Sequence, residues 1–239
     1  MIAIYKREVK SYFQSMIGYA FIAFLMLFTG IYFTAYNLNA GYPYFAYTLS
    51  GSMFIFLIAI PVLTMKSFSD ERKSKTDQML LTAPVSVTGI VLGKYLAMLT
   101  VFAIPCILFC AYPLAIKAWG TAYLKVDYAA IVMFFLIGCV YIAVGMFLSS
   151  LTESQIIAAV STFAVLLVMY LWGGLIGFLP SNTWGTALKG FLEKLDFSVA
   201  FSGVLESNLL DMSDVMLCIS IVFLFVFITV QTIQKRRWS

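Results

Sequence analysis

Long apolar stretches alternate with short charged segments along this chain. Residues 11–65 contain no charged side chain, and a polar, turn-like break at residues 37–43 divides them into two helix-sized halves. Four further apolar segments each hold about 20 residues, enough for a helix to cross a hydrocarbon core of ~30 Å. We therefore predict six transmembrane helices, at residues 17–36, 46–65, 90–115, 128–148, 156–178 and 215–233.

Composition supports a polytopic membrane protein and excludes a soluble globule. Hydrophobic residues make up 62% of the 239 residues and charged residues 11%, against roughly 45–50% and 25% in soluble domains. Disordered chains are poor in apolar residues, which excludes that class. No alternation of period two suggests a barrel. We expect an all-α polytopic membrane protein that forms one transmembrane domain over residues 1–239.

Lysine and arginine predict the orientation, because they concentrate on the cytoplasmic side of membrane proteins. Eleven fall on one side of the predicted helices and four on the other, so the first side is cytoplasmic and both termini lie there. The first set is Lys6, Arg7, Lys10, Lys66, Arg72, Lys73, Lys75, Lys94, Lys235, Arg236 and Arg237, and the second is Lys117, Lys125, Lys189 and Lys194.

Two cytoplasmic segments outside the bilayer have helical patterns. Residues 1–16 place apolar side chains on one face and basic ones elsewhere, which predicts an interfacial helix; a simple positively charged flank is the alternative. In the 66–89 loop, Ser67 and Asp70 have the spacing of a capping box, and Pro84 supplies a stop. We predict a short helix at residues 70–81 whose apolar end packs back on the bundle or docks to another protein.

A second long segment, residues 179–213, falls on the extracellular side. Apolar residues recur there at helical spacing among charged ones, which predicts an extracellular amphipathic helix. It either caps the bundle or shapes the exit of a pathway.

The sequence excludes much catalytic chemistry. The chain has no histidine, so it lacks Ser-His nucleophiles and His-ligated metals. Gly89, Gly93 and Lys94 do not have the spacing of a phosphate-binding loop. Cys106 and Cys110 alone make a poor metal site and suit small core positions. The net charge of +4 is too small to indicate nucleic-acid binding. We expect no catalytic residue, metal or cofactor in this chain.

Ionisable residues are also missing from the predicted membrane midplane, although ion-coupled transporters, proton relays and voltage sensors need them there. Lys94 falls near a cytoplasmic helix end and Glu153 in a short loop. If the chain moves a substrate, the energy therefore has to come from another subunit.

Three stretches carry a resemblance to a known family. Residues 71–84 (ERKSKTDQMLLTAP), followed by Ile90-Val-Leu-Gly-Lys94, resemble the coupling loop of ABC-2 type transporter permeases. The chain departs from that pattern at Lys75, where glycine is usual, and at Asp77, where an apolar residue is usual. Residues 6–19 and 201–206, with the tail 236–238, resemble the gliding-motility-type branch.

The resemblance implies a permease subunit that uses ATP hydrolysed by a separate cytoplasmic ATPase, which binds the ATP and magnesium. It implies export from a bacterial cytoplasmic membrane, a second permease copy, contact with membrane lipids and room for an extracellular accessory protein. The 66–89 loop then holds the coupling helix. The coupling residues it implies are Asp70, Glu71, Arg72, Lys75, Thr76, Gln78, Leu80, Leu81 and Pro84.

Two other functions stay open. The branch allows an ATPase-permease pair that transmits mechanical work to an envelope partner without substrate flux. A passive channel or membrane scaffold is the third interpretation, in which changes to the 66–89 loop have no effect. The residues that bind substrate are unknown.

Overall fold

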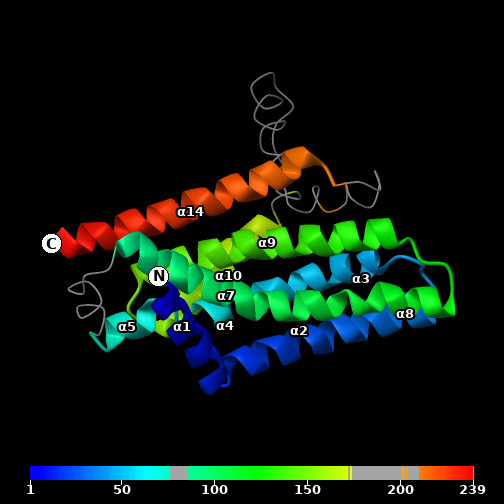
Figure 1. Ribbon diagram of the computed structural model, residues 1–239, viewed down its shortest axis with the longest axis horizontal. Helices are drawn as coiled ribbons and strands as arrows, with labels where there is room; N and C mark the ends of the chain where they lie inside the picture. The colour runs from blue at the N-terminus through cyan, green and yellow to red at the C-terminus, as the bar shows by residue number, and fades with distance from the viewer. Residues whose placement is uncertain (76–85, 172, 174–200, 202, 204–209, 239) are drawn as a thin grey trace.

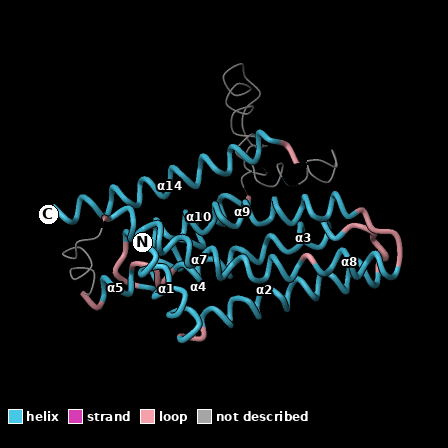
Figure 2. The backbone as a smooth tube through the Cα atoms, viewed as in Figure 1, coloured by secondary structure: helices cyan, strands magenta, loops and turns pink. Residues whose placement is uncertain are grey.

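The computed structural model describes residues 1–75, 86–171, 173, 201, 203 and 210–238. Helices without strands make up this described part, and most of them run along one axis (Figure 1). The two chain ends and α5 lie at the same end of the bundle, which we call the α5 end (Figure 1). Figure 2 shows that the connecting loops gather at the two ends.

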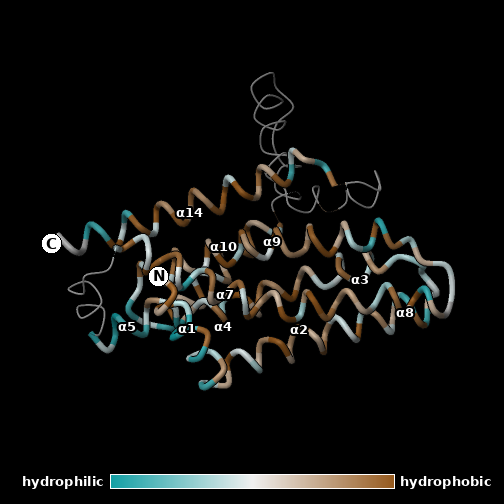
Figure 3. The backbone as a smooth tube through the Cα atoms, in the orientation of Figure 1, coloured by the Kyte–Doolittle hydropathy of each residue, from teal (hydrophilic) through white to brown (hydrophobic). Residues whose placement is uncertain are grey.

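Among the described residues, five helices are long and apolar enough to cross a membrane: Ile17–Asn39, Phe45–Lys73, Val87–Ala118, Leu124–Leu151 and Met212–Lys235. Apolar residues fill the middle of these helices, and polar ones gather toward the ends (Figure 3). The predicted span at 156–178 is described as a helix only in α10 (Gln155–Tyr170), and most of the rest, residues 172 and 174–178, lies outside the described residues. A polytopic helical membrane protein is thus confirmed, whereas the sixth span stays a prediction.

The first half of the chain departs from ideal α-helix in two spans. The first consists of α2 (Ile17–Phe33) and a π-helical segment, Thr34–Asn39. The second consists of α3 (Phe45–Ser52), a 3₁₀ turn (Met53–Ile55) and α4 (Phe56–Thr64). α1 (Ile2–Gln14) confirms a helix before the first span, and it crosses the α5 end of the bundle (Figure 1).

The third span is longer than predicted and is interrupted. α7 (Val87–Phe109) ends just before Cys110, and α8 (Ala111–Trp119) follows. Pro113 explains the break, because its ring would clash with the carbonyl of Phe109 four residues earlier, while proline is tolerated in the first turn of a helix. At its other end α7 is capped by Ser86, whose Oγ accepts a hydrogen bond from Gly89 N at 3.3 Å.

α9 (Leu124–Leu151) is the central helix. Within the apolar window of α9, 72% of the residues are buried, against 22% in the first span and in α14 (Met212–Trp238). Glycine lets its neighbours approach closely. A Cβ atom at Gly138 would lie 2.2 Å from Phe102 of α7, and one at Gly145 would lie 2.5 Å from Thr64 of α4. α9 therefore connects most of the bundle.

The helix predicted at residues 70–81 is described only in part, as α5 (Ser69–Lys73), and residues 76–81 lie outside the described residues. The backbone of Lys75 has φ 56°, in the left-handed region that L-residues avoid, so the helix does not continue through it. The predicted capping box is also wrong. Phe68 is the N-cap, and Ser67 Oγ has no hydrogen-bond partner in the described structure.

Candidate functional site

Four charged side chains from three helices meet at the α5 end. Arg7 and Glu8 come from α1, Glu71 from α5 and Lys94 from α7. Lys94 Nζ lies 3.0 Å from Glu71 Oε1 and 3.3 Å from Glu8 Oε1. Arg7 Nη2 lies 2.9 Å from Glu71 Oε1 and 2.7 Å from Glu8 Oε1. We call these four residues the charged cluster, and it joins α1, α5 and α7.

Lys94 is the buried centre of this cluster, with 2% of its side chain exposed. Its ammonium has three N–H donors. Glu8 and Glu71 accept two, and the backbone oxygen of Ser67 accepts the third at 2.7 Å. The ring of Phe68 lies 5.1 Å from Nζ and adds a cation–π contact. A buried charge needs such partners, and two carboxylates here balance two cations.

α5 is also tied to the turn between α9 and α10. Arg72 Nη2 lies 2.9 Å from Glu153 Oε1, and Arg72 Nη1 donates to the backbone oxygen of Ser150 at 3.4 Å. Gln155 Nε2, at the start of α10, donates to Asp70 Oδ1 at 2.6 Å. Three consecutive residues of α5 therefore contact four other elements of the bundle: α1, α7, α9 and α10.

Ser149 of α9 fixes the beginning of α5 from outside. Its Oγ accepts hydrogen bonds from the backbone nitrogens of Phe68 and Ser69, at 3.2 and 3.3 Å, and donates to Met65 O at 3.2 Å. The first N–H groups of a helix lack partners within the helix. A hydroxyl from the central helix supplies them here, so α5 is held against α9 at its N-terminus as well.

A cleft of about 500 Å³ borders the charged cluster, between α1 and α5. Arg7, Glu71 and Lys94 line it together with Lys66 and Tyr12. Burial raises the pKa of the Tyr12 hydroxyl, which therefore keeps its proton and donates to Leu63 O of α4 at 3.2 Å. A hydrogen bond to Glu8 raises the pKa of the Arg7 guanidinium, so the cation persists.

The structure separates the predicted coupling residues into two groups. Asp70, Glu71 and Arg72 all contact other helices of the same chain, whereas Lys75 is exposed. The remaining predicted coupling residues lie outside the described residues: Thr76, Gln78, Leu80, Leu81 and Pro84. The predicted extracellular helix within 179–213 also lies almost entirely outside them. Both assignments stay predictions.

Sequence reasoning missed several members of the site. Arg7 was predicted only as one of the basic residues of the interfacial helix, but it binds Glu8 and Glu71. Glu8 and Ser149 were not singled out at all. The available signal was Lys94, the one charged residue in the apolar stretch 90–116. A lysine buried there needs carboxylate partners from elsewhere in the chain.

A second polar group lies at the opposite end. Asp127, fully buried at the start of α9, accepts a hydrogen bond from Ala46 N at 3.2 Å and so caps α3. Asn37 bonds Thr48 Oγ1 at 2.6 Å and the backbone oxygen of Tyr42 at 2.8 Å. These contacts hold the connection between the first two spans in place. Among the described residues, no group of three or more His, Cys, Asp or Glu side chains could hold a metal ion.

Comparisons with known proteins point to a family. A family model described as ABC-2 family transporter protein matches residues 2–230, which is nearly the whole chain. A search of curated proteins gave no match.

Proposed function

The chain belongs to the ABC-2 family of transporter proteins, and from that premise we propose that it is the permease subunit of an ATP-driven exporter. Family membership makes it a membrane transport component without a catalytic site of its own. The finer parts of the proposal are export, a bacterial cytoplasmic membrane, a second copy of the permease and an ATPase that docks at the α5 end. The gliding-motility branch stays a prediction.

One observation carries the docking proposal: a five-residue helix at the end of the bundle is bonded to four other helical elements. Glu71 connects α5 to α7 through Lys94 and to α1 through Arg7. Arg72 and Asp70 connect it to the α9–α10 turn. A solvated loop needs no such anchoring, whereas a segment that transmits force does.

The bonds suggest how the force would travel. An ATPase that pushes on the 66–89 loop displaces α5, and the buried Glu71–Lys94 contact carries that displacement into α7. The contacts of Arg72 with Ser150 and Glu153 carry it into the end of the central helix α9 and the turn that follows. Because α9 packs against α4, α7, α10 and α14, its movement would displace these four helices together.

The test is expression of the chain with its chromosomal neighbours, gentle purification, and measurement of vanadate-sensitive ATP hydrolysis and substrate flux in vesicles. Arg72→Ala and Glu153→Ala should each lower flux per ATP, and the double variant should do no worse than either alone. The pair is largely exposed at Glu153, so its loss costs only about 0–1 kcal/mol of stability. Lys10→Ala, at an exposed position of α1, is the control.

The outcomes separate the candidate functions. Additive losses in the double variant, or losses equal to those of Lys10→Ala, would refute transmission through this contact. Hydrolysis that depends on an extracellular partner, without flux, would favour mechanical transmission to the envelope. A chain that purifies without an ATPase, with the 66–89 loop dispensable, would favour a channel or scaffold.

A further inference from the structure

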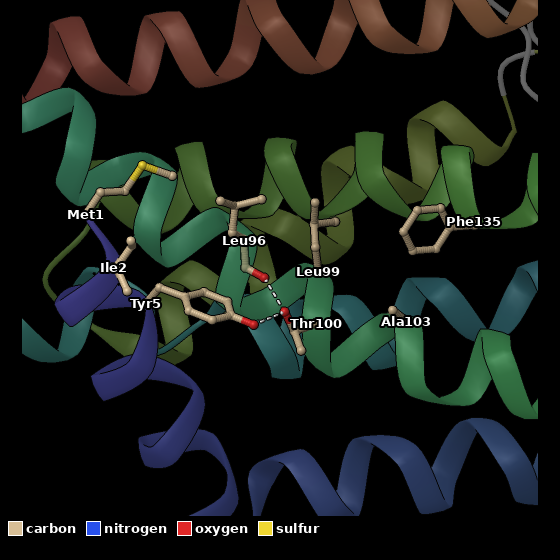
Figure 4. A pocket seen from close by; sticks show the side chains of 8 residues that line it. All are labelled: Met1, Ile2, Tyr5, Leu96, Leu99, Thr100, Ala103 and Phe135. Carbon is tan, nitrogen blue, oxygen red and sulfur yellow. Dashed lines mark hydrogen bonds between the residues drawn. The ribbon is translucent and has the colours of Figure 1, made fainter.

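An apolar pocket opens beside α1, on the side of α7 away from the charged cluster's carboxylates. It has a volume of about 370 Å³, within the roughly 300–1,000 Å³ typical of ligand pockets. Ile2 and Tyr5 of α1 form one wall, Leu96, Thr100 and Ala103 of α7 form the other, and Phe135 of α9 closes the far end (Figure 4).

The two hydroxyls in the pocket satisfy each other. Thr100 Oγ1 donates to Leu96 O at 2.8 Å, so the hydrogen bond of 2.9 Å between Tyr5 and Thr100 has the tyrosine as donor (Figure 4). No unused polar hydrogen of these two side chains then points into the pocket. The lining therefore favours a ligand made of hydrocarbon over a polar one.

The depth of the pocket matches the acyl region of one leaflet. Lys94 and its partners mark the polar level of the membrane at this end, and α7 continues from there into the apolar span. At 1.5 Å per residue, Leu96 lies roughly 3 Å and Ala103 roughly 14 Å beyond Lys94 along the helix axis. Half of a hydrocarbon core is about 15 Å thick, so the pocket covers one leaflet's chain region.

Charge at the rim points to the same ligand. Lys6 follows Ile2 by four residues on α1, which places it on the pocket side of that helix, and it is exposed. Ile2 itself is 71% exposed, so the pocket is open toward the surroundings at the headgroup level. An anionic headgroup beside Lys6 and an acyl chain between α1 and α7 fit this arrangement.

We propose that this pocket binds one acyl chain of an anionic membrane phospholipid, wedged between the interfacial helix α1 and α7. The acyl chain supplies apolar contacts to the side of α1 that carries Ile2 and Tyr5. The bound lipid thereby supports the helix that presents Arg7 and Glu8 to the charged cluster. This site is independent of ATP hydrolysis and of the transported substrate.

The test uses the full chain in phosphatidylethanolamine vesicles that contain phosphatidylglycerol with a photoactivatable diazirine on one acyl chain. After illumination, peptide mass spectrometry should find labels concentrated in residues 1–5 and 96–103. Ala103→Trp fills the pocket and should abolish that labelling. Ile107→Trp, at a 69% exposed position of the same helix outside the pocket, should leave it unchanged.

Ala103→Leu is a milder filling variant in case the tryptophan prevents folding, and it should reduce the labelling of both peptides. Unlabelled phosphatidylglycerol should compete better than unlabelled phosphatidylcholine. Labels spread evenly over the pocket and the exposed face of α10, or unchanged by both Ala103 variants, would show ordinary surrounding lipid and overturn the proposal. Residues of a second copy crosslinked into the pocket would overturn it too.

Discussion

Replacement of Lys94 by methionine tests the charged cluster most directly. Methionine keeps the volume and the apolar stem but removes the ammonium, which makes three contacts in the native protein. Glu8 and Glu71, with 13% and 18% of their side chains exposed, then lie close together, and Arg7 is the cation of the charged cluster that remains to balance them. We expect the free energy of unfolding to fall.

The expected loss follows from the burial. Removal of one partner from a buried ion pair costs about 3–5 kcal/mol, and the Arg7 contacts that remain place this case near 3 kcal/mol. For a chain of this size, each 1 kcal/mol lowers the melting temperature by roughly 2–4 °C. Lys94→Met should therefore melt about 6–12 °C below the native protein.

The native cysteines supply the assay. All four are free, and Cys106, Cys139 and Cys218 are buried, so a thiol-reactive fluorescent dye reports unfolding of the purified protein on heating. Lys73→Met, at an exposed position of α5, is the matched control and should melt within about 2 °C of the native protein, since exposed substitutions change stability by about ±0.5 kcal/mol.

A double variant makes the reasoning refutable. Lys94→Met together with Glu71→Gln removes one cation and one carboxylate, so it leaves less uncompensated charge than Lys94→Met alone. Apolar or neutral replacement of a whole buried pair is often close to neutral. The double variant should thus be more stable than Lys94→Met. A double variant that is less stable, or a Lys94→Met melting temperature equal to that of Lys73→Met, would show that the cluster does not stabilise this end.

Two further predictions use the same melting assay. Gly138→Ala places a Cβ atom 2.2 Å from Phe102, and this overpacking should lower the free energy of unfolding by about 1–3 kcal/mol. Gly30→Ala is the control, because its Cβ atom would lie 3.9 Å from the nearest neighbour and should cause no such loss. Equal effects of the two variants would contradict the close approach of α9 to α7. Lys75→Gly should raise stability by about 0.5–1 kcal/mol, because glycine tolerates φ 56°. Lys75→Ala keeps the Cβ atom and should bring no gain.

The sequence determined those features that depend on local composition. Apolar segments free of charge had to become helices, because a backbone in lipid can satisfy its hydrogen bonds only internally. α9, predicted at 128–148, is found at Leu124–Leu151, and the amphipathic pattern before residue 17 is the helix α1. The resemblance carried by residues 71–84 and 90–94 agrees with the family match.

Tertiary structure alone decided where the charges lie. Nothing local in the sequence indicates which carboxylates pair with Lys94, since they are 86 residues before it, at Glu8, and 23 residues before it, at Glu71. The cap of α5 comes from Ser149, 80 residues away. The left-handed backbone of Lys75, which stops α5 from continuing, has no signal in the sequence. Desolvation and ion pairing depend on which segments meet in space, and only the packed bundle brings these segments together.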